Sequence, residues 1–94
     1  MVLMKVSSNT NVGSLAGAIA GIVSEDCKVE AKCVGAGALN KLVKAVILAR
    51  KFVITEGIDL CCVPSFETVK TFEYAEETTA IKMVIEARLD GEHK

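Results

Sequence analysis

The spacing of the hydrophobic residues changes several times along this chain of 94 residues, and this alternation restricts the fold more than any other feature. Residues 12–25 and 38–52 carry apolar side chains at the intervals of an amphipathic helix. Other segments run apolar or alternate with a period of two, as strands do. The four strand-like segments are residues 2–6, 28–34, 58–63 with its continuation at 66–72 after Pro64, and 79–88.

Two helices of similar length must each bury an apolar stripe, and a four-stranded sheet has one face to offer them. The sequence therefore predicts an α+β fold, a two-layer sandwich in the order β-α-β-α-β-β, with both helices on one face of a mixed sheet. No linker divides the chain, so we expect one domain over residues 1–94, with frayed ends at 1–4 and 89–94. The nearly continuous apolar run 58–63 favours a central strand, and Pro64 predicts a bulge or a change of pairing after it.

The first predicted helix combines a cap with three glycines. Asn11 stands directly before the apolar period and is the predicted N-cap. Gly13, Gly17 and Gly21 follow at four-residue intervals, and each costs a helix about 0.5–1 kcal/mol relative to alanine. Two interpretations stay open: a smooth groove that admits a partner, or a helix that lies tightly on its own sheet.

The second predicted helix carries a basic sector. Lys41, Lys44 and Lys51 fall within a narrow arc and are expected to face outward. Residues 27–52 hold six basic residues against the single acidic Glu30, although the net charge of the whole chain is −1. The expected core residues of this helix are Leu39, Val43, Val46, Ile47 and Phe52.

Several functional classes are disfavoured by the composition. The amino terminus lacks the pattern of a signal peptide, and no apolar run reaches the roughly 20 residues of a membrane span, so we expect a cytoplasmic protein without membrane contact. The four cysteines form no CxxC pair and are expected to be reduced thiols in the core, without a metal. A catalytic cysteine would need a base, and the only histidine, His93, stands in the polar tail, so no enzyme is expected.

A series of short motifs closely resembles the bacterial stage V sporulation protein S family, which is Alba-like. The motifs occupy residues 5–7, 16–18 with 20–21, 35–40, 43–46, 49–50 with 52, 57 with 59–60, 64 with 66, and 79–82. The segment Gly-Ala-Gly-Ala-Leu-Asn at 35–40 is the most specific of them. The resemblance implies an Alba-like fold, homodimers or larger assemblies, a role in regulating spore development, nucleic acid as a ligand and no catalytic residues. Residues 8–11 are uncharged where Alba proteins carry lysines, and the hairpin at 73–78 is acidic.

The turn before the second helix supplies the site hypothesis. Backbone amides at the positive end of a helix suit a phosphate, and nearby cations strengthen the attraction. The predicted nucleic-acid site comprises Gly35, Ala36, Gly37, Asn40, Lys41 and Lys44, assisted by Lys5 and Arg50. Asn40 occupies the place of the third glycine in a dinucleotide fingerprint, so no cofactor is expected. Alternatively, the glycines only make the turn and the lysines only keep the surface soluble.

Two functions remain in competition. The first is a homodimeric protein that binds the backbone of DNA or RNA, with little sequence specificity and with steep salt dependence. The second is a protein-interaction or self-assembly module without a nucleic-acid ligand, which the sequence pI of about 5.8 favours. No small-molecule substrate is expected in either case.

Overall fold

The computed structural model of this chain describes residues 1–71 and 74–89, and it has the predicted order of elements. The elements are strand β1 (Val2–Val6), helix α1 (Val12–Ser24), strand β2 (Val29–Cys33), helix α2 (Ala36–Val53), a short 3-10 helix η1 (Ile54–Glu56), strand β3 (Ile58–Thr71) and strand β4 (Tyr74–Leu89). Of the end predicted to fray, residues 90–94 lie outside the described residues, and Leu89 pairs with Ile58. Of the hairpin predicted at 73–78, residue 73 lies outside the described residues and residues 74–78 belong to β4.

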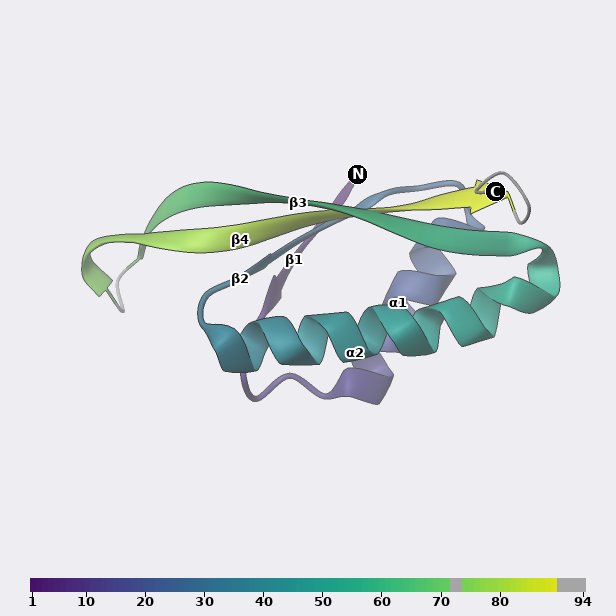
Figure 1. Cartoon of the computed structure of the whole chain (residues 1–94), viewed down its shortest axis with the longest axis horizontal. Helices are drawn as coiled ribbons and strands as arrows, with labels where there is room; N and C mark the ends of the chain where they lie inside the picture. Colours follow the sequence, from purple (N-terminus) through teal and green to yellow (C-terminus); the bar gives the residue numbers. More distant parts are fainter. Residues whose placement is uncertain (72–73, 90–94) are drawn as a thin grey trace.

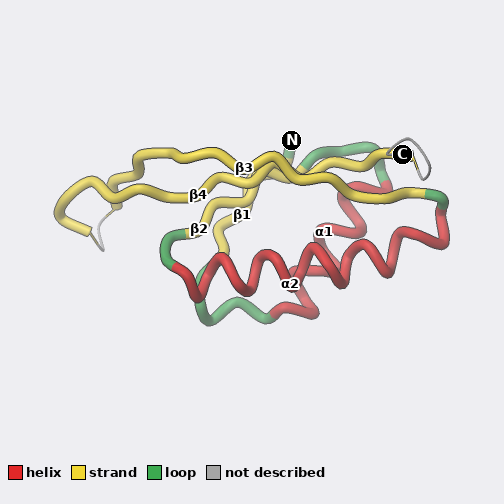
Figure 2. The backbone as a smooth tube through the Cα atoms, viewed as in Figure 1, coloured by secondary structure: helices red, strands yellow, loops and turns green. Residues whose placement is uncertain are grey.

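The four strands form one mixed sheet in the order β1-β2-β4-β3. Strands β1 and β2 run parallel, whereas β4 runs antiparallel to both β2 and β3. Both helices lie on the same side of the sheet (Figure 1), and the backbone trace in Figure 2 shows the two layers. The predicted α+β two-layer sandwich is therefore confirmed. We call the side of the sheet away from the helices the open face.

The position of β3 differs from the sequence prediction. Strand β3 is at the edge of the sheet rather than at its centre, and Pro64 pairs in register with Met83. The irregularity lies further on, between Val69 and Thr71. An edge strand tolerates proline, because the missing N–H can face the unpaired side. The apolar run could not reveal this position, since α2 packs against β3 and covers part of the strand.

The structure also differs from the fraying expected at residues 1–4 and from the predicted start of the last strand. Strand β1 begins at Val2, whose N–H donates to the Lys28 carbonyl at 2.9 Å, so residues 2–4 are paired rather than frayed. Strand β4 begins at Tyr74, five residues before the predicted start at Thr79. The long β3–β4 hairpin consequently projects past the first turn of α2 (Figure 1).

Helix α1 has the predicted cap and a single buried stripe. The Asn11 side chain accepts a hydrogen bond from the Ser14 N–H at 2.8 Å, which confirms it as the N-cap. A Cβ atom added to Gly17 or Gly21 would meet nothing within 4 Å. The glycines therefore face outward, and the interpretation in which they lie tightly on their own sheet is wrong. The buried residues are Leu15, Ala16, Ile19 and Val23.

Helix α2 is rotated relative to the prediction. Val43, Ile47 and Phe52 were expected in the core, yet 43%, 49% and 51% of their surfaces are exposed. Val46 is buried as predicted, and Leu39 packs against the core. Small side chains on the buried face allow α2 to lie close to its neighbours, and this leaves the larger residues outside. The buried residues of α2 are Ala38, Leu42, Ala45, Val46, Ala49 and Val53.

Candidate nucleic-acid interface

The first turn of α2 presents backbone amides without acceptors. Gly35 is the N-cap and offers no side chain, and the first helical hydrogen bond runs from the Leu39 N–H to the Gly35 carbonyl at 3.2 Å. The N–H groups of residues 36–38 thus have no acceptor within the helix. Gly35 adopts φ 89° and ψ 159°, a region that only glycine occupies without strain. Gly35 is therefore needed for the backbone conformation that starts the helix here.

The loop after β1 packs against this turn. A Cβ atom on Gly37 would come within 3.3 Å of the Ser8 Cβ, so only glycine allows this approach without a shift of the loop. The Ser7 N–H donates to the Thr10 hydroxyl at 2.9 Å, and the Thr10 N–H donates to the Ser7 carbonyl at 3.1 Å. These bonds order the loop and leave Ser8 beside the helix. The sequence prediction did not include Ser8, although a glycine inside the first turn was the available signal for a close neighbour.

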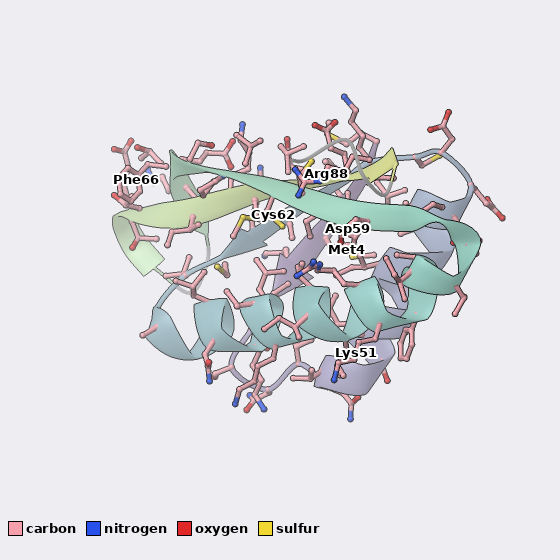
Figure 3. All side chains as sticks on the ribbon, turned by 45° about the vertical axis from the view of Figure 1, so that its right-hand side comes forward. Met4, Lys51, Asp59, Cys62, Phe66 and Arg88 are labelled. Atoms are coloured by element: carbon pink, nitrogen blue, oxygen red, sulfur yellow. The ribbon has the colours of Figure 1, made fainter. Side chains whose placement is uncertain are left out.

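The predicted cations Lys41 and Lys44 follow this turn along α2. Asn40 and Lys44 are exposed, and Lys41 is partly buried. None of the three α2 lysines makes an ion pair with another described residue, so their charges are not neutralised within the part of the fold that is described. Figure 3 shows the third of them, Lys51, on the side of α2 that faces away from the sheet. The outward basic sector therefore has the predicted orientation.

Two predicted site residues lie elsewhere. Lys5 belongs to β1, where its neighbours Met4 and Val6 face the helices, so Lys5 points to the open face. The Arg50 guanidinium is held by Asp59 of β3, with Nε–Oδ1 and Nη2–Oδ2 distances of 2.7 and 3.1 Å. This hydrogen bonding raises the pKa of Arg50 above its usual value. The structure brings together Gly35, Ala36, Gly37, Asn40, Lys41 and Lys44, and it separates Lys5 and Arg50 from them.

Comparison with known proteins identifies the family. The family model described as stage V sporulation protein S (SpoVS) matches residues 2–88. The chain belongs to the SpoVS family. Among solved structures, Alba from Thermoplasma volcanium superposes with a TM-score of 0.60 at 14% sequence identity, over 89% of this chain and 98% of that one. At this identity the match supports the fold alone, and it agrees with the Alba-like topology predicted from the sequence.

The remaining metal-ligating and nucleophilic side chains of this SpoVS-family chain are dispersed over the described residues. Within residues 1–71 and 74–89, no group of three or more histidine, cysteine, aspartate or glutamate side chains is placed to hold a metal ion. Burial raises the pKa of the Cys62 thiol, which disfavours the reactive thiolate. Cys33 is buried as expected, but Cys27 is exposed, so the cysteines do not all lie in the core. No helix among the described residues is both long and apolar enough to cross a membrane.

An apolar flank borders the basic sector. Val43, Ile47 and Ile54 recur on one stripe of α2 together with Arg50, which reaches Asp59 in β3, so the stripe follows the edge of the sheet. On β3 itself, Phe66 (labelled in Figure 3) is 82% exposed and shares the helix-facing side with its partner Ile81, whereas Val63, 57% exposed, points to the open face with Glu67. We call the exposed side chains of Val43, Ile47, Ile54 and Phe66 the apolar flank. Val43 and Ile47, which were expected in the core, belong to this flank.

Proposed function

We propose that this chain is a non-enzymatic regulator of spore development that acts in the cytoplasm as a homodimer and binds the backbone of nucleic acid. The observation that carries the proposal is the position of Lys41 and Lys44, unpaired among the described residues, directly after helix amides that lack acceptors. Membership of the SpoVS family supports the regulatory role, and the first turn of α2 supports the ligand.

The chemistry of this surface suits phosphates rather than bases. Helix amides and lysine ammonium groups contact phosphate oxygens, and such contacts carry no sequence information. The exposed Ser8 and Asn40 side chains add neutral hydrogen-bonding groups beside the cations. We therefore expect binding that varies little with sequence and weakens steeply as salt is added.

The apolar flank supports the homodimer. Contiguous exposed hydrophobic residues on a small soluble domain are typical of an interface. A second copy packed on this flank would cover Ile47 and Phe66 and would place two basic sectors in one particle. Ile47→Glu should then convert dimers to monomers in sedimentation experiments, whereas Leu3→Glu, at an apolar residue outside the flank, should leave the dimer intact.

The experiment that tests the ligand is a fluorescence-anisotropy titration at low salt with duplex DNA and, separately, duplex RNA. The double variant Lys41→Glu and Lys44→Glu should weaken binding by about 100-fold, because each lysine supplies a charge-assisted contact of about 1.5 kcal/mol or more. The single variants Lys44→Glu and Lys51→Glu should be compared with each other, because both reverse one positive charge on the same helix. Lys51 lies at the far end of α2, so its variant should bind more tightly than the Lys44 variant.

The alternative is an interaction module without nucleic acid, favoured by the outward glycine face of α1 and by the acidic pI. If neither DNA nor RNA binds at low salt and the double variant behaves as the natural chain, this alternative replaces the proposal. Equal losses for the Lys44 and Lys51 variants would instead mean that binding follows net charge and not the first turn of α2.

A further inference from the structure

A row of three lysines crosses the open face of the sheet. In the strand register, Lys5 of β1 pairs with Lys32 of β2, and Lys32 pairs with Lys82 of β4. Like charges at directly paired positions destabilise a sheet. The row therefore carries an electrostatic cost that the fold must offset.

Two carboxylates offset part of this cost. Lys32 Nζ lies 2.6 Å from Oε2 of Glu67, an oxygen that is otherwise without a hydrogen-bond partner among the described residues. The Glu30 carboxylate lies near two of the lysines, with its Oε2 3.9 Å from Lys32 Nζ and its Oε1 4.0 Å from Lys82 Nζ. Lys5 makes no ion pair with a described residue, so one end of the row remains a free cation.

The free end of the row opens into a pocket of about 500 Å³. Its walls come from β1, from Lys32 of β2 and from the projecting part of β3. The Lys32–Glu67 ion pair spans β4 and links β2 to β3 at this pocket. The lining residues are Leu3, Met4, Lys5, Lys32, Glu67, Thr68, Val69 and Lys70.

The lining combines excess positive charge with apolar surface. Three lysines face one carboxylate, and Leu3, which is 67% exposed, and Val69 supply aliphatic groups. Pockets of this volume suit small molecules, and mixed walls with a few charged groups give such sites their orientation and specificity. Nucleic-acid backbone is a poorer match, because its continuous charge would also meet Glu67.

We propose that this pocket binds a small organic anion, with an anionic head such as a phosphate or carboxylate between Lys5 and Lys32 and an apolar body against Leu3 and Val69. The site is separate from the first turn of α2, because it lies on the opposite face of the sheet. The inference therefore stands whether or not the chain binds nucleic acid.

The test is a ¹H–¹⁵N NMR titration of the full chain with phenyl phosphate, a probe that joins a phosphate to an apolar ring. Saturable shifts should cluster at the amides of the lining residues, with a Kd of about 1 mM, as expected for a ligand of this size. Inorganic phosphate, which lacks the apolar body, and benzyl alcohol, which lacks the charge, should both bind more weakly.

Three variants decide the outcome. Lys5→Gln should weaken the binding of phenyl phosphate by about tenfold, whereas Lys51→Gln, at an exposed and equally unpaired lysine outside both the pocket and the first turn of α2, should leave the Kd unchanged. Glu67→Gln should tighten binding by about two- to fivefold, because it removes the carboxylate that competes for Lys32. Shifts that do not saturate, equal losses for the two lysine variants, or displacement of the probe by duplex DNA would overturn the separate anion site.

Discussion

Two groups of lysines in this chain lie on different faces of the fold, and they differ in whether a carboxylate compensates them. On the sheet, Lys28, Lys32 and Lys82 lie within 4.0 Å of glutamate oxygens, and Lys28 is 3.0 Å from Glu86. On the outward side of α2, Lys41, Lys44 and Lys51 have no such partner among the described residues. The net charge of −1 conceals this division.

The difference shows which charges are available to a ligand. A lysine beside a carboxylate contributes little to the electric field outside the protein, because the two charges cancel at a distance. A lysine without a partner keeps its field and can attract a polyanion. Paired charges should therefore affect the stability of the fold, and unpaired charges should affect binding. The predictions below test this separation, from the largest expected effect to the smallest.

The largest effect is expected at the most buried charge. Asp59 is 2% exposed, holds Arg50, and accepts the Leu60 N–H at 2.8 Å. Asp59→Ala would leave both donors without this acceptor, so the free energy of unfolding should fall by about 3 kcal/mol. Chemical denaturation would measure the loss, with Asp59→Asn as the variant that keeps one acceptor and loses less.

The same variant sharpens the comparison when its binding is measured. If Arg50 serves the fold and not the ligand, folded Asp59→Ala should bind duplex DNA within about twofold of the natural chain. If Asp59→Ala is as stable as the natural chain, or if it loses as much DNA affinity as the lysine variants do, the distinction between paired and unpaired charges is wrong.

A smaller effect is expected when single lysines are neutralised. Lys44→Gln should lower the affinity for duplex DNA by about tenfold at low salt, because it removes one charge-assisted phosphate contact. Lys82→Gln changes the net charge equally, yet it should leave affinity within about twofold, since Glu30 already compensates that lysine. Anisotropy titrations at several salt concentrations would also give a shallower salt dependence for Lys44→Gln alone. Identical behaviour of the two variants would contradict the role given to carboxylate pairing.

Much of the fold could be predicted because it depends on local periodicity. The helical spacing at 12–25 and the position of Asn11 fixed α1 to within one residue at its carboxyl end. The requirement that two stripes share one sheet face gave the layers and the mixed sheet. These inferences use residues that are neighbours in sequence, and the physics that decides them is also local.

The errors occurred where neighbours in space decide the outcome. The pattern of α2 admitted two adjacent stripes, and the structure buries the one rich in small residues, such as Ala45 and Ala49, leaving Val43 and Ile47 outside. The apolar run of β3 indicated a central strand, but α2 packs against that strand at the edge of the sheet. Hydrophobicity shows that a residue needs cover, and it does not show which element provides it.

The candidate site divides in the same way. Lys41 and Lys44 could be placed on one side of a helix from their spacing, and that surface exists. The surroundings of Lys5 and Arg50 could not be predicted in this way, because they depend on Lys32 and Asp59, which are distant in the chain. Sequence spacing is therefore a good guide to residues on one helix and a poor guide to partners across elements.

The smallest effect concerns the pH range of the Lys32–Glu67 ion pair. The hydrogen bond from Lys32 lowers the pKa of Glu67 below its usual 4.5, and the same bond raises the pKa of Lys32 above its usual 10.5. The stabilisation by Glu67 is thus present above pH 4.5 and is lost as the pH falls through its lowered pKa. The stabilisation by Lys32 is present below pH 10.5 and is lost as the pH rises through its raised pKa.

Thermal unfolding from about pH 3 to pH 11 would reveal this window as a difference between the natural chain and Glu67→Gln. The difference should be greatest near neutral pH and should shrink at both extremes, where one partner loses its charge. Glu25→Gln is the matched control, because Glu25 makes no ion pair with a described residue. A difference that persists unchanged into acid would show that Glu67 stabilises the sheet by packing, and the sheet lysines would then be less compensated than the distances indicate.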